Sequence, residues 1–385
     1  MKSYIYIFIL ASLIFVSCEK ELEFKGDVVE PMLVVNSVFL PDANIEVSLT
    51  QSRFFLNSSN DNYKKISDGD VDLYVNGEFK EKLAYKKKEV INEFDYSFYD
   101  DSYQEPEEMV YISDYKPKVN DELQLKAAAP KLNSVYTNII KVPHSVEILS
   151  SNISNYRAQL NKFFWGDNDF FIPIEEKGAE MIDDEYEDDA DNSYYLKEEF
   201  NLQFDFQEEA KTNNYYILEI FSNKISSNGR QVYQKLNHKK KNFTDDGFGI
   251  DFNSFMIKNS VFAQNLDVEI SIFEDEFYEM SDYFIFDDGL IDGERFKFDL
   301  DITISGDVEL SSEQKLLKNE LIIILTHLSK EYFLYKKSLD AYLEESYSLF
   351  SEPIQVYTNI NNGIGVFATK NSSKYVINLP TYFEE

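Results

Sequence analysis

The sequence predicts a mainly β protein whose core is built from antiparallel sheets. Aromatic residues make up 16% of the chain and are mostly Tyr and Phe, which favour the pleated, half-buried surfaces of sheets. Short segments that alternate apolar and polar residues recur roughly every ten residues, with turn signals between them. The dipeptide Asn76-Gly77 lies between two such segments and is the strongest short-range sign of a β-hairpin.

Residues 1–17 have the layout of an export signal. Lys2 and the free amine give a positive start, and the stretch from Tyr4 to Val16 is predominantly apolar. This stretch is shorter than the roughly twenty residues of a membrane-spanning helix, but it has the length of a signal peptide's apolar region. It runs into Val16-Ser17-Cys18, which resembles the bacterial lipobox, with Phe15 where Leu is usual. We therefore predict a lipoprotein signal peptide over residues 1–17.

Cys18 is the only cysteine of the chain. It has no partner for an intramolecular disulfide and lies at the cleavage point, so we expect it to carry lipid rather than to be an ordinary buried thiol. Two or more acyl chains, palmitate among them, would hold the protein stably at a membrane. Residues 18–30 would then be a lipidated, polar tether. Its acid-rich start, Glu19 to Glu23, fits a surface-export tag or a merely solvated tether.

Residues 31–143 are predicted to form an immunoglobulin-like β-sandwich. The apolar run MLVVNSVFL opens this domain, and DELQLKAAAP adds a later short strand that Pro130 stops. Two segments between them alternate strictly, at Ile45, Val47 and Leu49 and again at Val71, Leu73 and Val75. Short strands at this spacing are typical of antiparallel sandwiches.

Residues 144–385 are predicted to form a larger antiparallel β-rich domain with one or a few helices. Strand patterns occur in SVEILSSNI, EFNLQFDFQ, NNYYILEIFS, RQVYQKLN, ERFKFDLDITIS and NELIIILTHLS, and alternation recurs at Leu266, Val268, Ile270 and Ile272. The segment 175–192 is dense in acidic residues, and like charges resist packing, so we expect a mobile surface loop there. Ser329 is a good N-cap for a helix over about 330–345, where apolar residues recur at helical spacing.

The net charge of −33 makes this an acidic protein, which disfavours binding to nucleic acid through its general field. Such a charge attracts cations and cationic partners, although solubility alone also explains it. Acidic clusters make calcium binding a weak hypothesis. Its candidates are Asp245-Asp246, Asp287-Asp288 with Asp292, and the acidic loop. None has the spacing of an EF-hand, and Asp-Gly pairs are what ordinary turns use.

Residues for other chemistry are sparse, and we predict no catalytic, metal-binding or cofactor-binding residue. The three histidines, His144, His238 and His327, lie far apart in the sequence and lack the cysteines of a zinc site, so His327 is expected to be structural. GIGVFA, starting at Gly363, formally fits a dinucleotide-binding pattern. That pattern needs a following helix, whereas KYVINLP is strand-like, so the glycines more plausibly allow a turn or a close backbone approach.

Several segments in order resemble the DUF4249 family of Bacteroidota outer-membrane lipoproteins. They are CEKELE with MLVVNSVFLPDANIEVSLTQS, VNDELQLKAAAP with VPHSVEI, NNYYILEIFS, FDDGLIDGERFKFDL and PIQVYTNINNGIGVFA. The last is the most distinctive, through Asn359, Asn362, Gly363, Gly365 and Phe367. The chain departs from the family pattern in its acidic insertion at 175–191 and in Ala368, where Gly is common.

The resemblance implies an envelope lipoprotein, often encoded near a TonB-dependent transporter, and it supplies no catalytic residues. We therefore expect a non-catalytic lipoprotein, lipid-anchored at the outer membrane and facing the cell surface. Its expected partner is a TonB-dependent transporter or another outer-membrane barrel. A structural or adhesive surface role is the alternative. A hydrolase acting on an envelope polymer through two carboxylates is a third reading, which seventy acidic residues neither support nor exclude.

Overall fold

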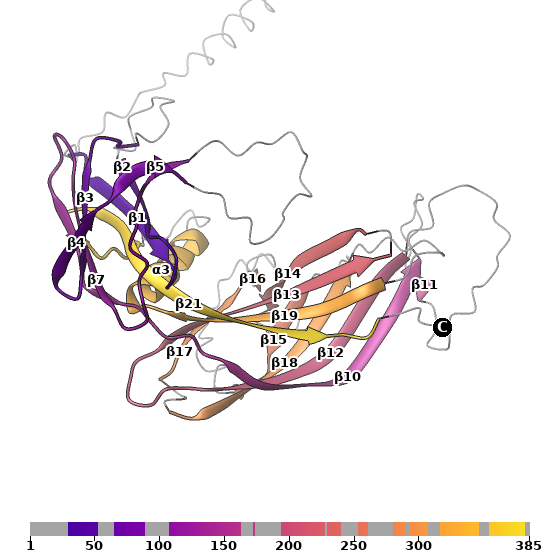
Figure 1. Cartoon of the computed structure of the whole chain (residues 1–385). Helices are drawn as coiled ribbons and strands as arrows, with labels where there is room; N and C mark the ends of the chain where they lie inside the picture. Colours follow the sequence, from indigo (N-terminus) through magenta and orange to yellow (C-terminus); the bar gives the residue numbers. More distant parts are fainter. Residues whose placement is uncertain are drawn as a thin grey trace, which may run out of the picture.

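The computed structural model describes residues 30–52, 65–88, 108–162, 172–173, 194–227, 229–239, 253–260, 280–289, 291, 293–306, 316–345 and 354–381. They form a smaller β-sandwich and a longer curved sheet, set at an angle to each other (Figure 1). The fold is mainly β, as the sequence predicts. The predicted acidic loop and the alternation from Leu266 to Ile272 lie outside the described residues.

The sandwich consists of two sheets. One sheet has the strand order β21-β1-β2-β6-β5 and the other has the order β20-β8-β7-β3-β4, with β9 beside β7. The bounds in the first sheet are β1 Leu33–Phe39, β2 Glu46–Gln51, β5 Ala84–Lys87, β6 Met109–Ile112 and the start of β21, Ile364–Asn378. Those in the second are β3 Asp70–Val75, β4 Glu78–Lys82, β7 Glu122–Ala128, β8 Val135–Thr137, β9 Ile140–Lys141 and β20 Ile360–Asn361.

The alternating residues of these strands form the core between the two sheets. Ile45, Val47, Val71 and Leu73 are fully buried, as their period of two predicts. Asn76 and Gly77 both have positive φ, 53° and 83°, as a two-residue hairpin turn requires, and they join β3 to β4. The predicted hairpin is confirmed.

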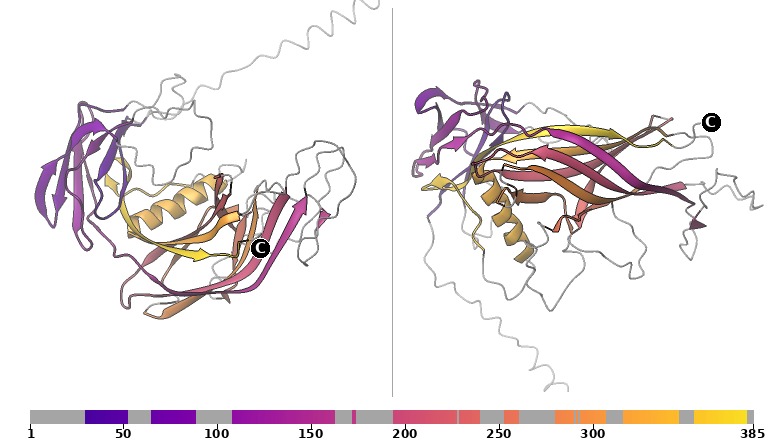
Figure 2. Two further views of the ribbon diagram at one scale, coloured as in Figure 1. Left: turned by 45° about the vertical axis from the view of Figure 1, so that its right-hand side comes forward. Right: turned by 90° about the horizontal axis from the view of Figure 1, so that it is seen from below.

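The curved sheet has the order β11-β10-β12-β18-β15-β14-β13-β19-β21, with β16 paired to β14 and β17 paired to β13. Several of its strands are long, and they make the curved sheet the longer part of the molecule (Figure 2). Their bounds are β10 Ile148–Lys162, β11 Ile172–Pro173, β12 Tyr194–Gln207, β13 Tyr215–Ser226, β14 Gln231–Lys239, β15 Ser254–Ile257, β16 Met280–Ser281, β17 Phe284–Asp287, β18 Arg295–Gly306 and β19 Leu316–Leu328.

The curved sheet wraps around its own apolar core. The predicted alternation in β12 holds, because Phe200, Leu202, Phe204 and Phe206 all point into this core and are buried. Strands β10 and β21 approach each other where Ser151 Oγ lies 3.3 Å from Tyr375 OH. The core is therefore enclosed by strands that are far apart in the order of the sheet.

Strand β21 belongs to both parts of the molecule. Its first residues, 364–369, pair in parallel with β1, and residues 370–378 pair antiparallel with β19. Ile360 in β20 and Phe367 in β21 pack in the core of the sandwich. The sandwich thus takes in a segment from the C-terminal region, which the predicted boundary at residue 143 does not include.

The glycines of GIGVFA allow β1 and β21 to lie side by side. Gly365 has a φ of 111°, and a Cβ atom there would lie 2.1 Å from the carbonyl oxygen of Val35. A Cβ at Gly363 would lie 2.7 Å from the carbonyl oxygen of Leu33. The residues that follow form a strand, not the helix that a dinucleotide-binding motif needs.

The helix α3, Lys330–Glu345, covers the residues predicted for it. Ser329 is its N-cap, since Ser329 Oγ accepts a hydrogen bond from the backbone N–H of Tyr332 at 3.4 Å. Phe333 packs against Ile217 in β13 and Leu328 in β19. The helix therefore lies on the face of the curved sheet opposite its core, near the angle between the two parts (Figure 2).

Candidate functional site

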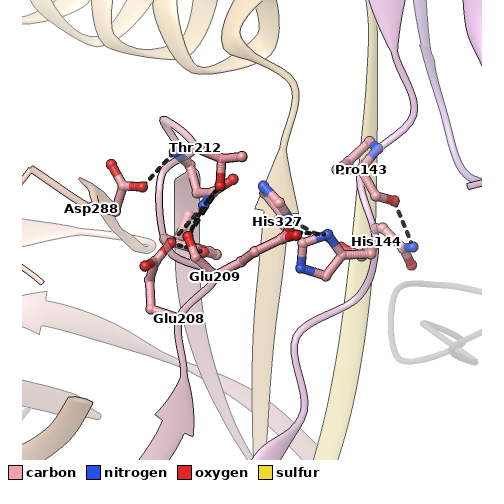
Figure 3. A network of polar contacts seen from close by, with 10 residues as sticks. Pro143, His144, Glu208, Glu209, Thr212, Asp288 and His327 are labelled. Carbon is pink, nitrogen blue, oxygen red and sulfur yellow. Dashed lines mark hydrogen bonds and ion pairs between the residues drawn. The ribbon is translucent and has the colours of Figure 1, made fainter. Parts of the chain in front are cut away.

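A polar cleft of about 470 Å³ lies where the sandwich joins the curved sheet. Ligand sites commonly have this size and lie at such junctions. We call it the junction cleft, and its lining residues are Asn120, His144, Gln207, Glu208 and Glu209. His144 directly follows the sandwich, and the two glutamates follow β12. Figure 3 shows how His144, Glu208 and Glu209 gather there.

Glu208 is buried at the base of the junction cleft and accepts hydrogen bonds from several donors. Asn214 Nδ2 donates to Glu208 Oε1 at 2.5 Å, and Tyr216 OH lies 3.4 Å from the same oxygen. The backbone N–H of Gly293 donates to Oε2. The nearby carboxylate of Asp288 accepts the backbone N–H of Asn214 at 2.8 Å (Figure 3). These carboxylates hold the loop after β12 in place, and protein donors already occupy them.

His144 and His327 form the histidine pair of this site. Their ring centroids are 4.8 Å apart, edge to face, and the Tyr216 ring lies 5.1 Å from the His327 ring at a tilt of 36°. His327 Nδ1 lies 3.0 Å from the carbonyl oxygen of His144. Because a carbonyl only accepts, Nδ1 carries the proton of the neutral ring. His144 and His327 are distant in sequence, but the fold brings β19, which carries His327, next to the segment after Pro143, which carries His144.

Burial controls the ionisation of His327. Its side chain is almost fully buried, and this burial lowers its pKa to about 4, with His144 contributing in the same direction. The ring is therefore neutral near pH 7 and serves as a hydrogen-bond donor. The expectation of a structural role for His327 agrees with these contacts. His144, in contrast, is partly exposed in the cleft, with its Nδ1 3.3 Å from Glu209 Oε2.

A second depression of about 190 Å³ lies between α3 and the outer face of the curved sheet. We call it the α3 groove, and its polar lining includes Glu219, Lys235, Asp282, Tyr283, Lys336 and Lys370. These residues supply three lysines against two carboxylates, and Asp340, which Tyr283 contacts, adds a third carboxylate. The groove therefore holds closely spaced charges of both signs.

Tyr283 contacts charged side chains on both sides of the α3 groove. The hydroxyl of Tyr283 donates to Asp340 at 2.6 Å, and burial raises the pKa of Tyr283. Lys336 Nζ lies 4.2 Å above the Tyr283 ring, and burial lowers the pKa of Lys336. Lys235 Nζ lies 2.6 Å from Glu219 Oε1. Lysines beside an aromatic ring suit an acidic or zwitterionic group of a binding partner.

The structure places the other residues of interest as follows. Cys18, Asp245, Asp246, Asp292 and the acidic loop lie outside the described residues. Asp287 Oδ1 accepts the N–H of Gly289 at 3.1 Å and so stabilises a turn. His238 packs against the rings of Phe255 and Phe284. In the part of the chain that the structure describes, no group of His, Cys, Asp and Glu side chains is placed to hold a metal ion.

Sequence reasoning missed Glu208, Asn214 and Lys336. Glu208 is one of seventy acidic residues, so its type alone carries no signal. The sequence signal that could have found Glu208 is its position directly after a strongly alternating strand, because a buried carboxylate there needs hydrogen-bond partners from the next loop. Lys336 is a polar residue among apolar ones at helical spacing. The sequence does not show which strands the helix packs against, so it does not place Lys336 in a groove.

Comparison with protein families gives one match. The family model described as "Domain of unknown function (DUF4249)" matches residues 19–375. No curated protein matches the chain. The matched region begins at the residue after Cys18 and includes both the sandwich and the curved sheet.

Proposed function

Since the chain belongs to the DUF4249 family, we propose that it is a non-catalytic, lipid-anchored accessory protein of the outer membrane. In this role it faces the cell surface and docks on a TonB-dependent transporter or another outer-membrane barrel. The observation that carries the proposal is the position of Cys18. It ends a short apolar stretch with the layout of a signal peptide, and the family match begins at the next residue.

The tether sets how far the body lies from the membrane. Residues 18–30 span at most about 45 Å when fully extended. In the part of the chain that the structure describes, no helix has both the length and the apolar character needed to cross a bilayer. Attachment in this proposal therefore depends on the lipid at Cys18, and the tether keeps the body within reach of a membrane partner.

The body has features that suit docking. Strand β21 runs through both parts, so a partner that binds one part also orients the other. The junction cleft and the α3 groove offer polar and charged side chains near the angle between the parts. The net charge of −33 favours a partner surface that is neutral or basic.

Metabolic labelling with palmitate tests the anchor. The wild-type protein should incorporate label and fractionate with membranes, whereas Cys18→Ser should do neither. Ser17→Ala is the matched control, because it keeps a small residue before the cysteine and should still incorporate label. A Cys18→Ser protein that is labelled as strongly as the wild type would contradict the proposal.

Docking is tested by gentle crosslinking and pulldown of the tagged protein at native expression. The expected result is recovery of an outer-membrane barrel with the wild type and its loss with Cys18→Ser. Recovery of the bait alone, under conditions that retain other known outer-membrane complexes, would count against an accessory role. Normal growth but altered attachment of a deletion strain would then favour a structural or adhesive role.

A further inference from the structure

A charged pair lies inside the core of the curved sheet. Glu198 on β12 has an exposed fraction of 0% and Lys224 on β13 one of 2%. Lys224 Nζ lies 2.5 Å from Glu198 Oε2. Burying two charges in this way is expensive, and a pair of well-packed apolar residues is often as stable or more stable. The pair therefore calls for an explanation beyond packing.

Asn319 completes this group. It lies on β19, next to β13, and it is the direct register partner of Lys224 in that antiparallel pair. Side chains of register partners lie on the same face, with Cβ atoms roughly 4.5–5.5 Å apart. Asn319 Nδ2 donates to Glu198 Oε1 at 2.7 Å. A single buried carboxylate thus contacts both the amine of Lys224 and the amide of Asn319.

The surroundings of the group are apolar. Leu196 and Phe200 flank Glu198 on the same face of β12, and Ile304 is its register partner on β18; all three are buried. The hydroxyl of Tyr156 donates to Glu198 Oε1. Water is therefore largely excluded from the amine, the amide and the carboxylate.

The polar atoms of the group are incompletely satisfied. Glu198 Oε2, Lys224 Nζ and Asn319 Oδ1 have no aligned hydrogen bond, and the 2.5 Å contact between the amine and the carboxylate lacks hydrogen-bond geometry. Buried groups in this condition are rare in folded proteins and each needs a reason. A reaction between the amine and the amide supplies one.

We propose that Lys224 and Asn319 form an intramolecular isopeptide bond and that Glu198 is the acid–base group of this reaction. Glu198 takes a proton from the ammonium of Lys224, and the resulting amine attacks Cγ of Asn319. A C–N bond forms between Nζ and Cγ, and the C–N bond from Cγ to Nδ2 breaks. Nδ2 leaves as ammonium: it gains one proton from the attacking nitrogen and one that Glu198 had taken from Lys224, and Glu198 returns to its carboxylate form. No oxidant, metal or cofactor enters the balance.

Two physical factors favour the reaction. In an apolar interior both charges lose hydration, which raises the free energy of the ion pair and favours a reaction that removes it. The sheet also holds the amine beside the amide, which replaces a collision between separate molecules by a local step. Folding itself is therefore the trigger. This inference does not depend on the lipid anchor or on docking.

Peptide mass spectrometry of the full-length, purified protein tests the bond. Trypsin cleaves after unmodified Lys224 and would release residues 212–224 as a linear peptide. A bonded Lys224 blocks that cleavage. The expected product is a branched peptide, in which residues 212–230 are joined to residues 319–330 and the total mass is lower by one ammonia. Fragmentation should place the branch at Lys224 and Asn319.

Variants separate the roles of the three residues. Glu198→Gln keeps the shape of the side chain but cannot take the proton, so the branched peptide should be lost while linear peptides appear. Lys224→Arg should give the same result. Glu320→Gln is the matched control: it makes the same acid-to-amide change next to Asn319, on a side chain that bonds Asn223, and should keep the branch.

The wild-type measurement tests whether the bond exists even where a variant fails to fold. Folded wild-type protein that yields only linear peptides, with Lys224 and Asn319 both unmodified, would overturn the proposal and leave a buried ion pair. A branched peptide that persists at the wild-type yield in folded Glu198→Gln would overturn the role of Glu198.

Discussion

At the scale of single residues, two buried side chains, Glu208 and His327, hold the backbone in place around the junction cleft. Glu208 collects donors from Asn214, Tyr216 and Gly293, and His327 donates to the backbone of His144. Both residues fix the chain where the sandwich meets the curved sheet. Each can be tested by a change that alters one physical property.

The stability of the fold should fall as the pH drops from about 6.5 to about 4, because of His327. Burial lowers the pKa of His327 to about 4, whereas an unfolded histidine titrates at about 6.5. Between these values the unfolded chain binds a proton that the folded ring does not, so protonation favours unfolding. The loss should reach roughly 3 kcal/mol at most. Urea unfolding at several pH values measures it.

His327→Gln is the comparison for this prediction, because the amide can still donate to the carbonyl of His144 but does not titrate. Its stability should change less over the same pH range. Asp121 and Asp205, whose pKa values hydrogen bonds hold below the ordinary one of 3.8, contribute an equal loss of stability in both proteins, so the comparison cancels their contribution. An equal loss of stability in wild type and His327→Gln between pH 6.5 and pH 4 would show that His327 is not the source.

Glu208→Gln should destabilise the protein by about 2–4 kcal/mol. The amide puts a donor group where the carboxylate accepts from Asn214 and Gly293, so at least one buried donor is left unsatisfied. Glu209→Gln makes the identical change one residue later, on an exposed side chain, and should stay within about 0.5 kcal/mol of the wild type. Chemical unfolding of both variants measures the difference, and equal values would argue against Glu208 as the organising residue.

At the scale of elements, β21 is the strand that joins the sandwich to the curved sheet. It pairs in parallel with β1 and antiparallel with β19, and the close approach to β1 needs glycine. In the parallel register Gly365 lies opposite Val35, whose carbonyl oxygen leaves no room for a Cβ atom. The strand therefore links a local backbone requirement to the arrangement of the whole chain.

Gly365→Ala should destabilise the protein by at least about 3 kcal/mol. Its φ of 111° is strained for any residue with a Cβ atom, and that atom would lie 2.1 Å from the carbonyl oxygen of Val35. Gly77→Ala is the matched control, because its φ is 83° but the space beside it is open. It should cost only about 1–2 kcal/mol. Thermal or urea unfolding compares them, and equal effects would refute the close-approach argument.

Much of the element structure could be predicted from the sequence because it depends on local pattern. The alternation of Phe200 to Phe206, the Asn76-Gly77 turn and the N-cap Ser329 each act through neighbours along the chain. The role of the glycines in GIGVFA also followed from the missing helix. The division of β21 between two sheets could not be predicted, because both halves have the same strand pattern.

The sites depend on contacts over long sequence distances, so the sequence revealed them poorly. His144 meets His327, and Glu198 meets Lys224 and Asn319, only because the curved sheet sets the register of its strands. None of these residues has a distinctive local spacing. The proposed lipid anchor, in contrast, was predicted from the sequence, because its signal is the position of Cys18 directly after an apolar segment.

At the scale of the whole molecule, the chain has a net charge of −33 and its described residues form two joined parts, and we propose that a lipid at Cys18 attaches it to a membrane. The single strand β21 makes the body one unit, and the junction cleft and α3 groove lie near the angle of that unit. The net charge of −33 disfavours contact with anionic head groups, so in the proposed role attachment depends on the lipid at Cys18.

The most direct test of this account is the mass of the N-terminal peptide of the mature protein, isolated from the membrane fraction. We expect the peptide to begin at Cys18 and to carry acyl chains on that residue. A mature chain that begins elsewhere, or an unmodified Cys18 in protein that fractionates away from membranes, would contradict it.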